Sequence, residues 1–213
     1  MPVIDLAFHV LGSAIPADHG FLLFSAVSEA IPSLHASEGV GIHSIAGRLS
    51  GDRRLSLTDH SRLTLRLPAE RITEVLPLAG HALQIGEHTV RVGVPTPMAL
   101  VPAPHLYCRV VTIKGFLEPE GFLGAVQRQL CALEIAATPS LVAQPHIAER
   151  NAERAGGTRS PFLRRTLRIH DKEVVGFAVR VEELTAEESV RLQETGLGGR
   201  RRFGCGLFIP DRS

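Results

Sequence analysis

Glycines and arginines gather near the end of the chain, in a pattern that suits the binding of phosphate. The glycines are Gly196, Gly198, Gly199, Gly204 and Gly206, and Arg200, Arg201 and Arg202 lie between them. Glycine permits positive φ and leaves no side chain between the backbone and a bound group, and successive free N–H groups in such a loop can form an anion-binding concavity. Arginine adds a rigid fork of donors that matches phosphate oxygens. The stretch therefore predicts contact with a phosphate backbone, most economically that of a nucleic acid.

A purely structural interpretation of these glycines stays open, because glycine-rich segments before a strand often form tight turns. The order here is helix, loop, strand, which is the reverse of a dinucleotide-binding fingerprint, and the Lys-Ser/Thr pair of a P-loop is missing. The chain is therefore not expected to be a nucleotide-binding protein of either kind.

The composition is that of a folded protein with little overall charge. The chain has 213 residues, 44% of them hydrophobic, with a net charge of +1 and a pI of about 7.9. General attraction to nucleic acid would need a pI above about 9, so any basic surface must be local. Cys108, Cys131 and Cys205 form no CxxC pair, which argues against a zinc site. With no signal peptide and no apolar run of about 18 residues, we expect a cytoplasmic protein without a membrane partner.

The elements that would position these residues fall into two halves. In the first half, apolar alternation predicts strands and apolar residues at helical spacing predict helices. The expected elements are a strand at 3–10, a helix that starts at an Asp18 N-cap and ends at Pro32, strands at 42–49, 55–57 and 63–67, a helix at 68–80, and two strands within 82–94. The order is β-α-β-β-α-β.

Four prolines between Pro95 and Pro104 mark a linker, after which the order repeats. We expect a strand at 106–113, a helix at 118–136, a polar loop at about 143–160, a hairpin of strands at 162–170 and 173–181, a helix opened by a capping box at Thr185 and Glu188, and a strand at 207–209. Each half is a split βαβ, ferredoxin-like unit, as in RNA-recognition modules. The sequence thus predicts an α+β fold with two tandem ferredoxin-like domains, at 1–95 and 106–213, joined by a Pro-rich linker at 96–105.

Aromatic residues do not follow the pattern of an RNA-recognition module. The chain has one Tyr, no Trp and nine Phe, and no predicted strand carries the aromatic pair on which such modules stack bases. Base stacking on a sheet face is therefore not expected.

A doubled fold that ends in a glycine-arginine loop resembles the CRISPR-associated repeat-RNA-processing endoribonucleases of the RAMP superfamily, which make guide RNAs. The resemblance covers the whole chain. It is carried by Asp18-His19-Gly20, Leu34-His35, Gly41-Ile42-His43-Ser44-Ile45 and the segment 198–206. The terminal loop identifies the superfamily well but separates its endonucleases poorly from its non-catalytic members.

The resemblance implies an enzyme that binds the hairpin of a CRISPR repeat and cuts on the 3′ side of the stem, without a metal or other cofactor. The 2′-hydroxyl of the nucleotide before the break attacks phosphorus, which leaves a 2′,3′-cyclic phosphate or 3′-phosphate and a 5′-hydroxyl. It also implies that the protein can stay on its product RNA, with other subunits of an interference complex as partners.

That reaction needs a base for the 2′-hydroxyl, an acid for the leaving oxygen and a cation for the charge at phosphorus. Imidazoles suit the first two roles and guanidinium groups the third. The resemblance points to His35, which matches the commonest position of the family, to His19, which matches another branch, and to His43 at the second strand. The helix dipole favours a neutral His19, which suits a base, and a protonated His35, which suits an acid. Which histidine takes which role stays open.

Basic residues of the second half are candidates for RNA binding. Arg164, Arg165 and Arg168 lie in a predicted hairpin strand, with Lys172 at its turn. In the family such a hairpin approaches the base of the RNA stem, although charges on a solvated edge strand also prevent aggregation. The terminal arginines 200–202 are assigned to phosphate contacts, which contribute affinity rather than sequence choice.

Two other functions remain compatible with the sequence. One is a non-catalytic RNA-binding structural subunit of a CRISPR interference complex, since such proteins share the glycine loop. The other is a ferredoxin-like binding module with no role in RNA metabolism.

Overall fold

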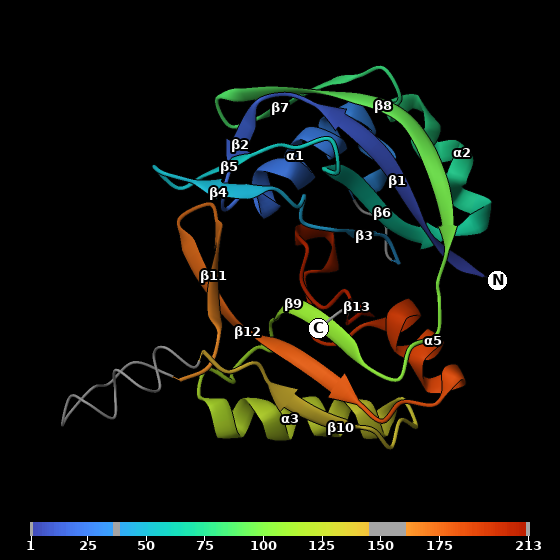
Figure 1. Ribbon diagram of the computed structural model, residues 1–213, viewed down its shortest axis with the longest axis vertical. Coiled ribbons are helices and arrows are strands. Elements are labelled where there is room, and N and C mark those ends of the chain that lie inside the picture. The colour runs from blue at the N-terminus through green and yellow to red at the C-terminus, as the bar shows by residue number, and fades with distance from the viewer. Residues whose placement is uncertain (1, 36–38, 145–160, 212–213) are drawn as a thin grey trace. The chain divides into compact units, whose positions relative to one another are not determined.

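The chain folds into two compact units. The computed structural model describes residues 2–35, 39–144 and 161–211 (Figure 1). The first unit comprises residues 1–100 together with residues 201–204, and the second comprises residues 101–200 and 205–213. The terminal loop is therefore divided, because four of its residues pack with the first unit.

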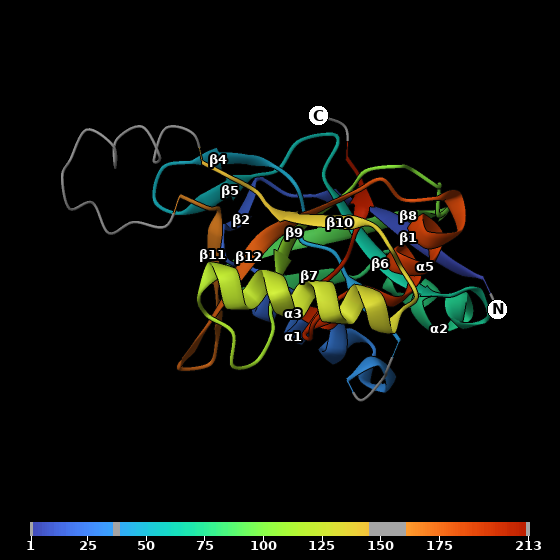
Figure 2. The same cartoon turned by 90° about the horizontal axis from the view of Figure 1, so that it is seen from below.

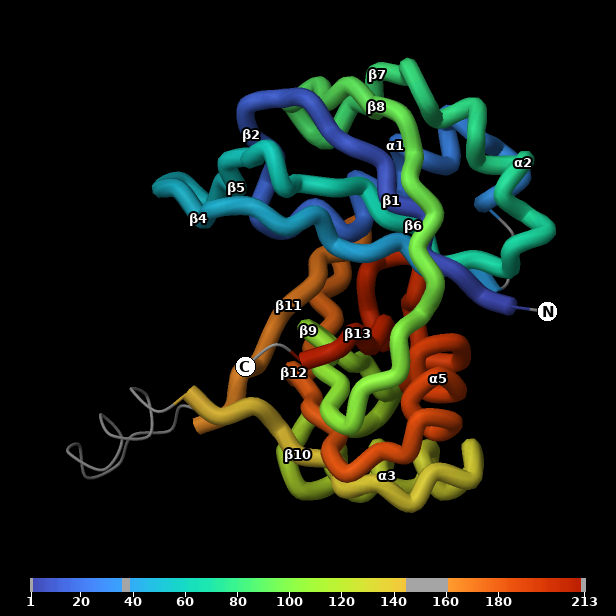
Figure 3. The backbone as a smooth tube through the Cα atoms, turned by 45° about the vertical axis from the view of Figure 1, so that its right-hand side comes forward, coloured from blue at the N-terminus to red at the C-terminus, as the bar shows by residue number. Residues whose placement is uncertain are grey.

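A five-stranded antiparallel sheet forms the centre of the first unit, in the order β3-β6-β1-β8-β7 (Figure 1). Its strands are β1 (Val3–Leu11), β3 (Gly41–Ile42), β6 (Arg62–Pro68), β7 (Ala82–Ile85) and β8 (His88–Ala99). A smaller sheet, β2-β5-β4, consists of β2 (Ala14–Pro16), β5 (Arg54–Ser56) and β4 (Arg48–Ser50) (Figure 3).

Apolar side chains on one face of the larger sheet form the core of the first unit. Leu6 and Phe8 alternate with polar or smaller residues along β1, and they pack in one buried cluster with Leu23 and Val27 of helix α1 (Gly20–Ala30) and with Leu65 of β6. Successive residues of a strand point to opposite faces. The even-numbered residues of β1 therefore belong to the core, and Asp5 is left on the other face.

Two predictions for the first unit are wrong in detail. Asp18 does not cap α1, because the helix begins one residue later, with His19 as its N-cap. The predicted helix at 68–80 is divided into short turns at Ala69–Arg71, α2 (Ile72–Val75) and Leu76–Leu78. Pro77 explains this division, since proline cannot donate to a helical hydrogen bond.

The predicted linker also differs from the structure. Strand β8 extends to Ala99 and pairs with β1 up to Ile4, so the first half of the expected linker belongs to the sheet. Pro95 and Pro97 are accommodated within this strand.

The second unit has an antiparallel sheet in the order β10-β12-β9-β13, and β11 also pairs with β12 (Figure 1). Strands β9 to β12 and helix α3 of this unit are also labelled in Figure 2. Its elements are β9 (Leu106–Val111), α3 (Pro119–Ala132), β10 (Thr138–Leu141), β11 (Arg164–Ile169), β12 (Lys172–Glu182), α5 (Ala186–Thr195) and β13 (Ile209–Pro210). The 3-10 turn Arg201–Phe203, between α5 and β13, belongs to the first unit. Helix α3 contributes Phe122, Val126 and Leu130 to a core shared with Leu106 and Phe177 of the sheet.

The sequence patterns do not predict strand β10. They predict that the hairpin strand at 162–170, which corresponds to β11, is the second strand of this half. The segment Thr138-Pro139-Ser140-Leu141 has a proline and little β-branched character, so it does not read as a strand. It nonetheless pairs with the end of β12, from Val179 to Glu182. Residues 145–160 of the predicted loop lie outside the described residues.

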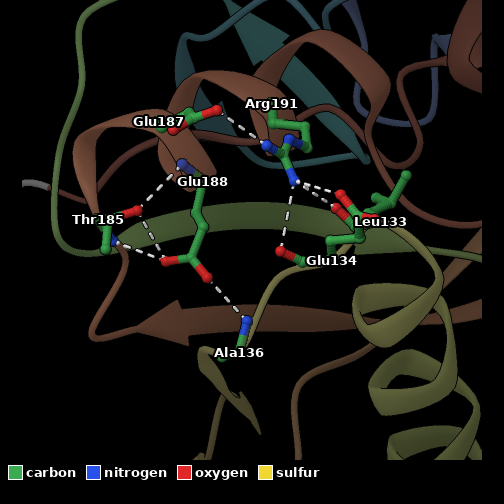
Figure 4. A network of polar contacts seen from close by, with 7 residues as sticks. All are labelled: Leu133, Glu134, Ala136, Thr185, Glu187, Glu188 and Arg191. Carbon is green, nitrogen blue, oxygen red and sulfur yellow. Dashed lines mark hydrogen bonds and ion pairs between the residues drawn. The ribbon is translucent and has the colours of Figure 1, made fainter.

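The predicted capping box at the start of α5 is confirmed. The Thr185 hydroxyl accepts from the Glu188 N–H, and the Glu188 carboxylate accepts from the Thr185 N–H (Figure 4). The same carboxylate accepts from the Ala136 N–H at 2.8 Å, and Arg191 donates to the Leu133 carbonyl at 2.9 Å (Figure 4). These bonds fix the end of α3 to α5, which leads into the glycine loop.

Helices long and apolar enough to cross a membrane are not found in the part of the chain that the structure describes.

Candidate functional site

The glycines of the terminal loop use their N–H groups within the protein, so these groups do not form the predicted anion-binding concavity. Gly196 donates to Leu192, Gly204 to Arg201 and Gly206 to Val110, in each case to a carbonyl. Likewise, Gly199 donates to the Thr112 carbonyl, and Gly198 donates to the side-chain oxygen of Gln129 at 2.7 Å. Because these donors are occupied, the glycine N–H groups are not the part of the loop that would contact phosphate.

Close backbone approach explains why glycine is needed at two of these positions. At Gly206, where φ is +69°, a Cβ atom would lie 2.1 Å from the Leu197 carbonyl oxygen, and at Gly198, where φ is +68°, it would lie 2.3 Å from that of Thr112. Both distances are far below van der Waals contact. At Gly199 a Cβ atom would meet nothing within 4 Å.

The 3-10 turn Arg201–Phe203 packs within the first unit. The Phe203 ring lies against Phe24 of α1, with centroids 4.9 Å apart and the rings nearly perpendicular, and its centroid is 5.9 Å from that of Phe21. Edge-to-face contact of this kind is the favoured geometry of aromatic pairs. The turn is therefore anchored to the first helix by its phenylalanine.

Arg202 lies beside His35. These residues are candidates for two different roles, charge stabilisation at phosphorus and proton transfer. The Arg202 guanidinium group donates to the His35 carbonyl oxygen and lies 5.3 Å from the Phe24 ring centroid and 5.8 Å from that of Phe203. His35 follows the short turn Pro32–Leu34, is exposed, and has its ring centroid 5.5 Å from that of Phe24. The structure thus places the Arg202 guanidinium group against the backbone of an exposed histidine that is 167 positions away in the sequence.

His43 belongs to a second, more buried group in the same unit. Asp5 and Arg66 are directly opposite each other on β1 and β6, and the arginine donates to both carboxylate oxygens, at 2.8 and 2.7 Å. The Nε2 atom of His43 lies 3.5 Å from the Asp5 carboxylate. The side chain of Arg66 is only 1% exposed and that of Asp5 13%, and Arg201 is close enough to act electrostatically on both.

Charges and burial set the protonation of this group. Burial raises the pKa of Asp5, but hydrogen bonds from Arg66 and His43 outweigh it and hold the pKa well below its usual range. Burial lowers the pKa of His43, and the contact with Asp5 does not fully compensate. Burial, reinforced by Arg66, also lowers the pKa of Arg201, to about 10. At neutral pH the group therefore holds one anion, two cations and a neutral imidazole.

His19 lies in a buried, hydrogen-bonded position of the first unit, which favours a structural role. Its side chain is buried, with Nδ1 2.9 Å from the Pro16 carbonyl oxygen and Nε2 accepting from the Ile45 N–H at 2.9 Å. These two partners require a proton on Nδ1 and none on Nε2. The imidazole is neutral, as the helix dipole predicted, but it holds the segment before α1 to the segment after β3 and has no nitrogen left for a substrate.

The predicted RNA-binding residues of the second half lie in the second unit. Arg164 and Arg168 are exposed on β11, while Arg165 on the opposite side is half-buried. Lys172 begins β12 and lines, with His170 and Arg200, a hollow of about 260 Å³ at the tip of the hairpin. This hollow brings Lys172 and Arg200 together, whereas Arg201 and Arg202 belong to the other unit.

Sequence reasoning missed the partners of the candidate residues. Asp5, Arg66, Phe21, Phe24 and Phe203 are not among the candidate residues that the sequence patterns single out. A signal did exist for Asp5 and Arg66, because each breaks the apolar run of a central strand and only a buried partner would permit that.

Within the described residues, no group of three or more His, Cys, Asp or Glu side chains is arranged to hold a metal ion.

Known proteins resemble the chain over almost its full length. A family model described as Cas6, "Cas6 Crispr", matches residues 4–213. The "CRISPR-associated endonuclease Cas6" of Myxococcus xanthus (strain DK1622) is 38% identical over 210 residues, which cover 99% of this chain and 82% of that protein.

Solved structures share the fold. The structure titled "Characterization of a Cas6-related gene from Pyrococcus furiosus" has a TM-score of 0.66 at 14% identity and covers 99% of this chain and 100% of that one. "An RAMP protein binding different RNA substrates" has a TM-score of 0.65 at 14% identity, with 97% and 98% covered. At such low identity the likeness concerns the mixed α/β fold alone. The family match, in contrast, spans the sequence from its first strand onwards, and this chain therefore belongs to the Cas6 family of CRISPR-associated proteins.

Proposed function

We propose that this protein is an endoribonuclease that cuts CRISPR precursor RNA within the repeat, 3′ of a stem-loop, and so produces guide RNAs. The observation that carries the proposal is the 38% identity to an endonuclease of the Cas6 family over 99% of the chain. The juxtaposition of His35 and Arg202 supports it, since an exposed imidazole and a fixed guanidinium group are what RNA cleavage at phosphorus needs.

The reaction requires no metal or cofactor in this proposal. The 2′-oxygen forms a bond to phosphorus as its proton passes to a base, and the bond from phosphorus to the 5′-oxygen breaks as that oxygen receives a proton. The products are a 2′,3′-cyclic phosphate and a 5′-hydroxyl. His35 exchanges a proton with the reacting oxygens, and Arg202 stabilises the charge that develops on the phosphate. We assign His43 a positioning role, through Asp5 and Arg201, because its side chain is only 16% exposed and lies against the Asp5 carboxylate.

We further infer that each unit is a ferredoxin-like domain. In the first unit four strands lie side by side in the order β3-β6-β1-β8. Numbered by their position along the chain, these are the second, third, first and fourth of the four strands. The second unit has the same order, β10-β12-β9-β13. Such an order with antiparallel neighbours supports the split βαβ unit. The basic side chains of β11 and the Lys172–Arg200 hollow would contact the RNA stem, and other subunits of an interference complex would join on the product RNA.

Incubation of the purified protein with its repeat RNA in EDTA tests this function. We expect one cut per repeat, a product whose mass corresponds to the cyclic phosphate, and no cut in RNA with a 2′-deoxy nucleotide before the break. His35→Ala should lower the single-turnover rate by about 10²- to 10⁴-fold, whereas His81→Ala, at an exposed histidine of the same unit, should have no effect.

The alternative of a non-catalytic RNA-binding subunit gives a different result. Tight, salt-sensitive binding of the repeat without any cleavage would favour that function over an enzyme. Absence of binding even at low salt would contradict both and leave a module with no role in RNA metabolism.

A further inference from the structure

Phe21, Phe24, Phe203 and Arg202 form one cluster beside His35, which we call the aromatic platform. The Phe203 ring is 4.9 Å from Phe24 and 5.9 Å from Phe21, centroid to centroid, and the guanidinium carbon of Arg202 lies within 6 Å of two of these rings. The three rings come from the first helix and from the terminal loop. The platform is therefore assembled only when the terminal loop is in place.

The accessibility of the platform differs from that of a core cluster. Phe24 is buried and supports the others, Phe21 and Phe203 are half-buried, and Arg202 is exposed. Arg202 is held by two rings and by the His35 carbonyl. A guanidinium group fixed in this way presents a rigid plane, and both such planes and aromatic rings stack unpaired bases in RNA recognition.

The proposed reaction creates a need for such a surface. Displacement at phosphorus requires the attacking and leaving oxygens to be roughly in line. In a stacked A-form strand the 2′-oxygen is not in line with the leaving 5′-oxygen, so a nucleotide next to the cut must leave the stack. Unstacking a base costs a few kcal/mol, and a surface that receives the base offsets that cost.

We propose that the aromatic platform stacks the unpaired base of a nucleotide that flanks the cleaved phosphate. The inference rests on the proposed endoribonuclease function. The platform lies at the imidazole that would act on this phosphate, and its exposed member carries the charge that complements RNA. Base stacking thus takes place at the first helix and terminal loop, not on a sheet face as in RNA-recognition modules.

An abasic scan combined with a ring deletion tests the platform. Repeat RNAs that lack one base at a time around the mapped cut are cleaved by the wild-type protein and by Phe203→Leu, which keeps an apolar side chain against Phe24. Phe116→Leu is the matched control, because Phe116 is also half-buried and has an arginine, Arg128, 5.4 Å over its ring.

We expect one abasic position next to the cut to slow wild-type cleavage by about tenfold, as loss of a base–aromatic stack predicts. With Phe203→Leu, the intact and abasic RNAs should be cut at equal, slow rates, and Phe116→Leu should retain the wild-type penalty. A 2-aminopurine at the same position of an uncleavable 2′-deoxy RNA should lose fluorescence on binding the wild-type protein but keep it with Phe203→Leu. This second measurement depends on binding and not on cleavage.

The failures of the two proposals are distinguishable. If the wild-type protein cuts the repeat but the abasic penalty is the same in Phe203→Leu, the platform is refuted and the endoribonuclease function stands. If 2-aminopurine fluorescence is equally quenched by both proteins, the base stacks elsewhere and the platform is again refuted. If the wild-type protein cuts no repeat RNA, the proposed function itself fails.

Discussion

Removal of Asp5 should damage the first unit far more than removal of its partner Arg66. The Asp5 carboxylate is the one anion of the group that it forms with Arg66, His43 and Arg201. It pairs with Arg66 and interacts electrostatically with Arg201. In Asp5→Ala two guanidinium groups remain without it, and one of them is 1% exposed. Loss of one partner from a buried pair costs about 3–5 kcal/mol. In Arg66→Met the carboxylate can still pair with Arg201, so we expect about 1–2 kcal/mol, the cost of lost hydrogen bonds.

Hydrogen exchange measured on peptides of β1 and β6 separates these cases. Each 1.4 kcal/mol changes an opening equilibrium tenfold, so Asp5→Ala should speed exchange at least about a hundredfold, and Arg66→Met about 5- to 30-fold. The double variant Asp5→Ala/Arg66→Met removes the repulsion with Arg201 and should exchange more slowly than Asp5→Ala alone. Equal damage from the two single variants, or a double variant worse than both, would refute the electrostatic account. Tyr107, the only tyrosine, lies in β9 of the other unit, so its fluorescence provides an internal control.

Three further perturbations have defined outcomes. The pKa of Asp5 is lower in the folded than in the unfolded chain, so its stabilisation is complete above about pH 4 and declines as the pH falls below that value; exchange protection of β1 should fall on acidification in the wild type and much less in Asp5→Ala. His19→Ala leaves the Pro16 carbonyl and the Ile45 N–H without their partner, so the free energy of unfolding in urea should fall by about 2–4 kcal/mol. The single-turnover cleavage rate of the folded protein at low temperature should change less than it does for His35→Ala. Gly206→Ala should lower both the thermal stability and the cleavage rate, because its Cβ atom would lie 2.1 Å from a carbonyl oxygen. Gly199→Ala is the control and should match the wild type, because its Cβ atom would meet nothing within 4 Å. A Gly206→Ala protein with wild-type behaviour would contradict the close packing.

The sequence was informative wherever a signal is local. The capping box at Thr185 follows from side-chain spacing alone, and the main helices and strands follow from apolar periodicity. His35, in contrast, was a candidate because of the family resemblance, and it lies directly after the turn Pro32–Leu34. The long helix predicted at 68–80 shows the limit of periodicity, because Pro77 divides it into short turns although the apolar spacing continues.

Features that depend on distant pairing could not be predicted. The bond between Asp5 and Arg66 requires the register of β1 against β6, and a single sequence does not give that register. The glycine N–H groups looked available for phosphate because their acceptors, such as the Thr112 carbonyl and the Gln129 side chain, come from remote elements. His19 looked like a candidate base for the same reason, since its partners are visible only in the fold.

In the proposed function the glycine loop and His35 act together, because the loop carries Arg202. The N–H groups of its five glycines are engaged within the protein. At Gly198 and Gly206 glycine allows a close approach of backbone to backbone, and the loop residues Arg201, Arg202 and Phe203 pack within the first unit. Arg202 then lies at His35, and Arg201 lies near Asp5. Substitution of Gly206, where a Cβ atom would meet the Leu197 carbonyl oxygen, should consequently impair catalysis by displacing Arg202, more than it impairs RNA affinity. The small net charge of +1 is compatible with this arrangement, because a reaction at one phosphate needs one correctly placed guanidinium group rather than a generally basic surface.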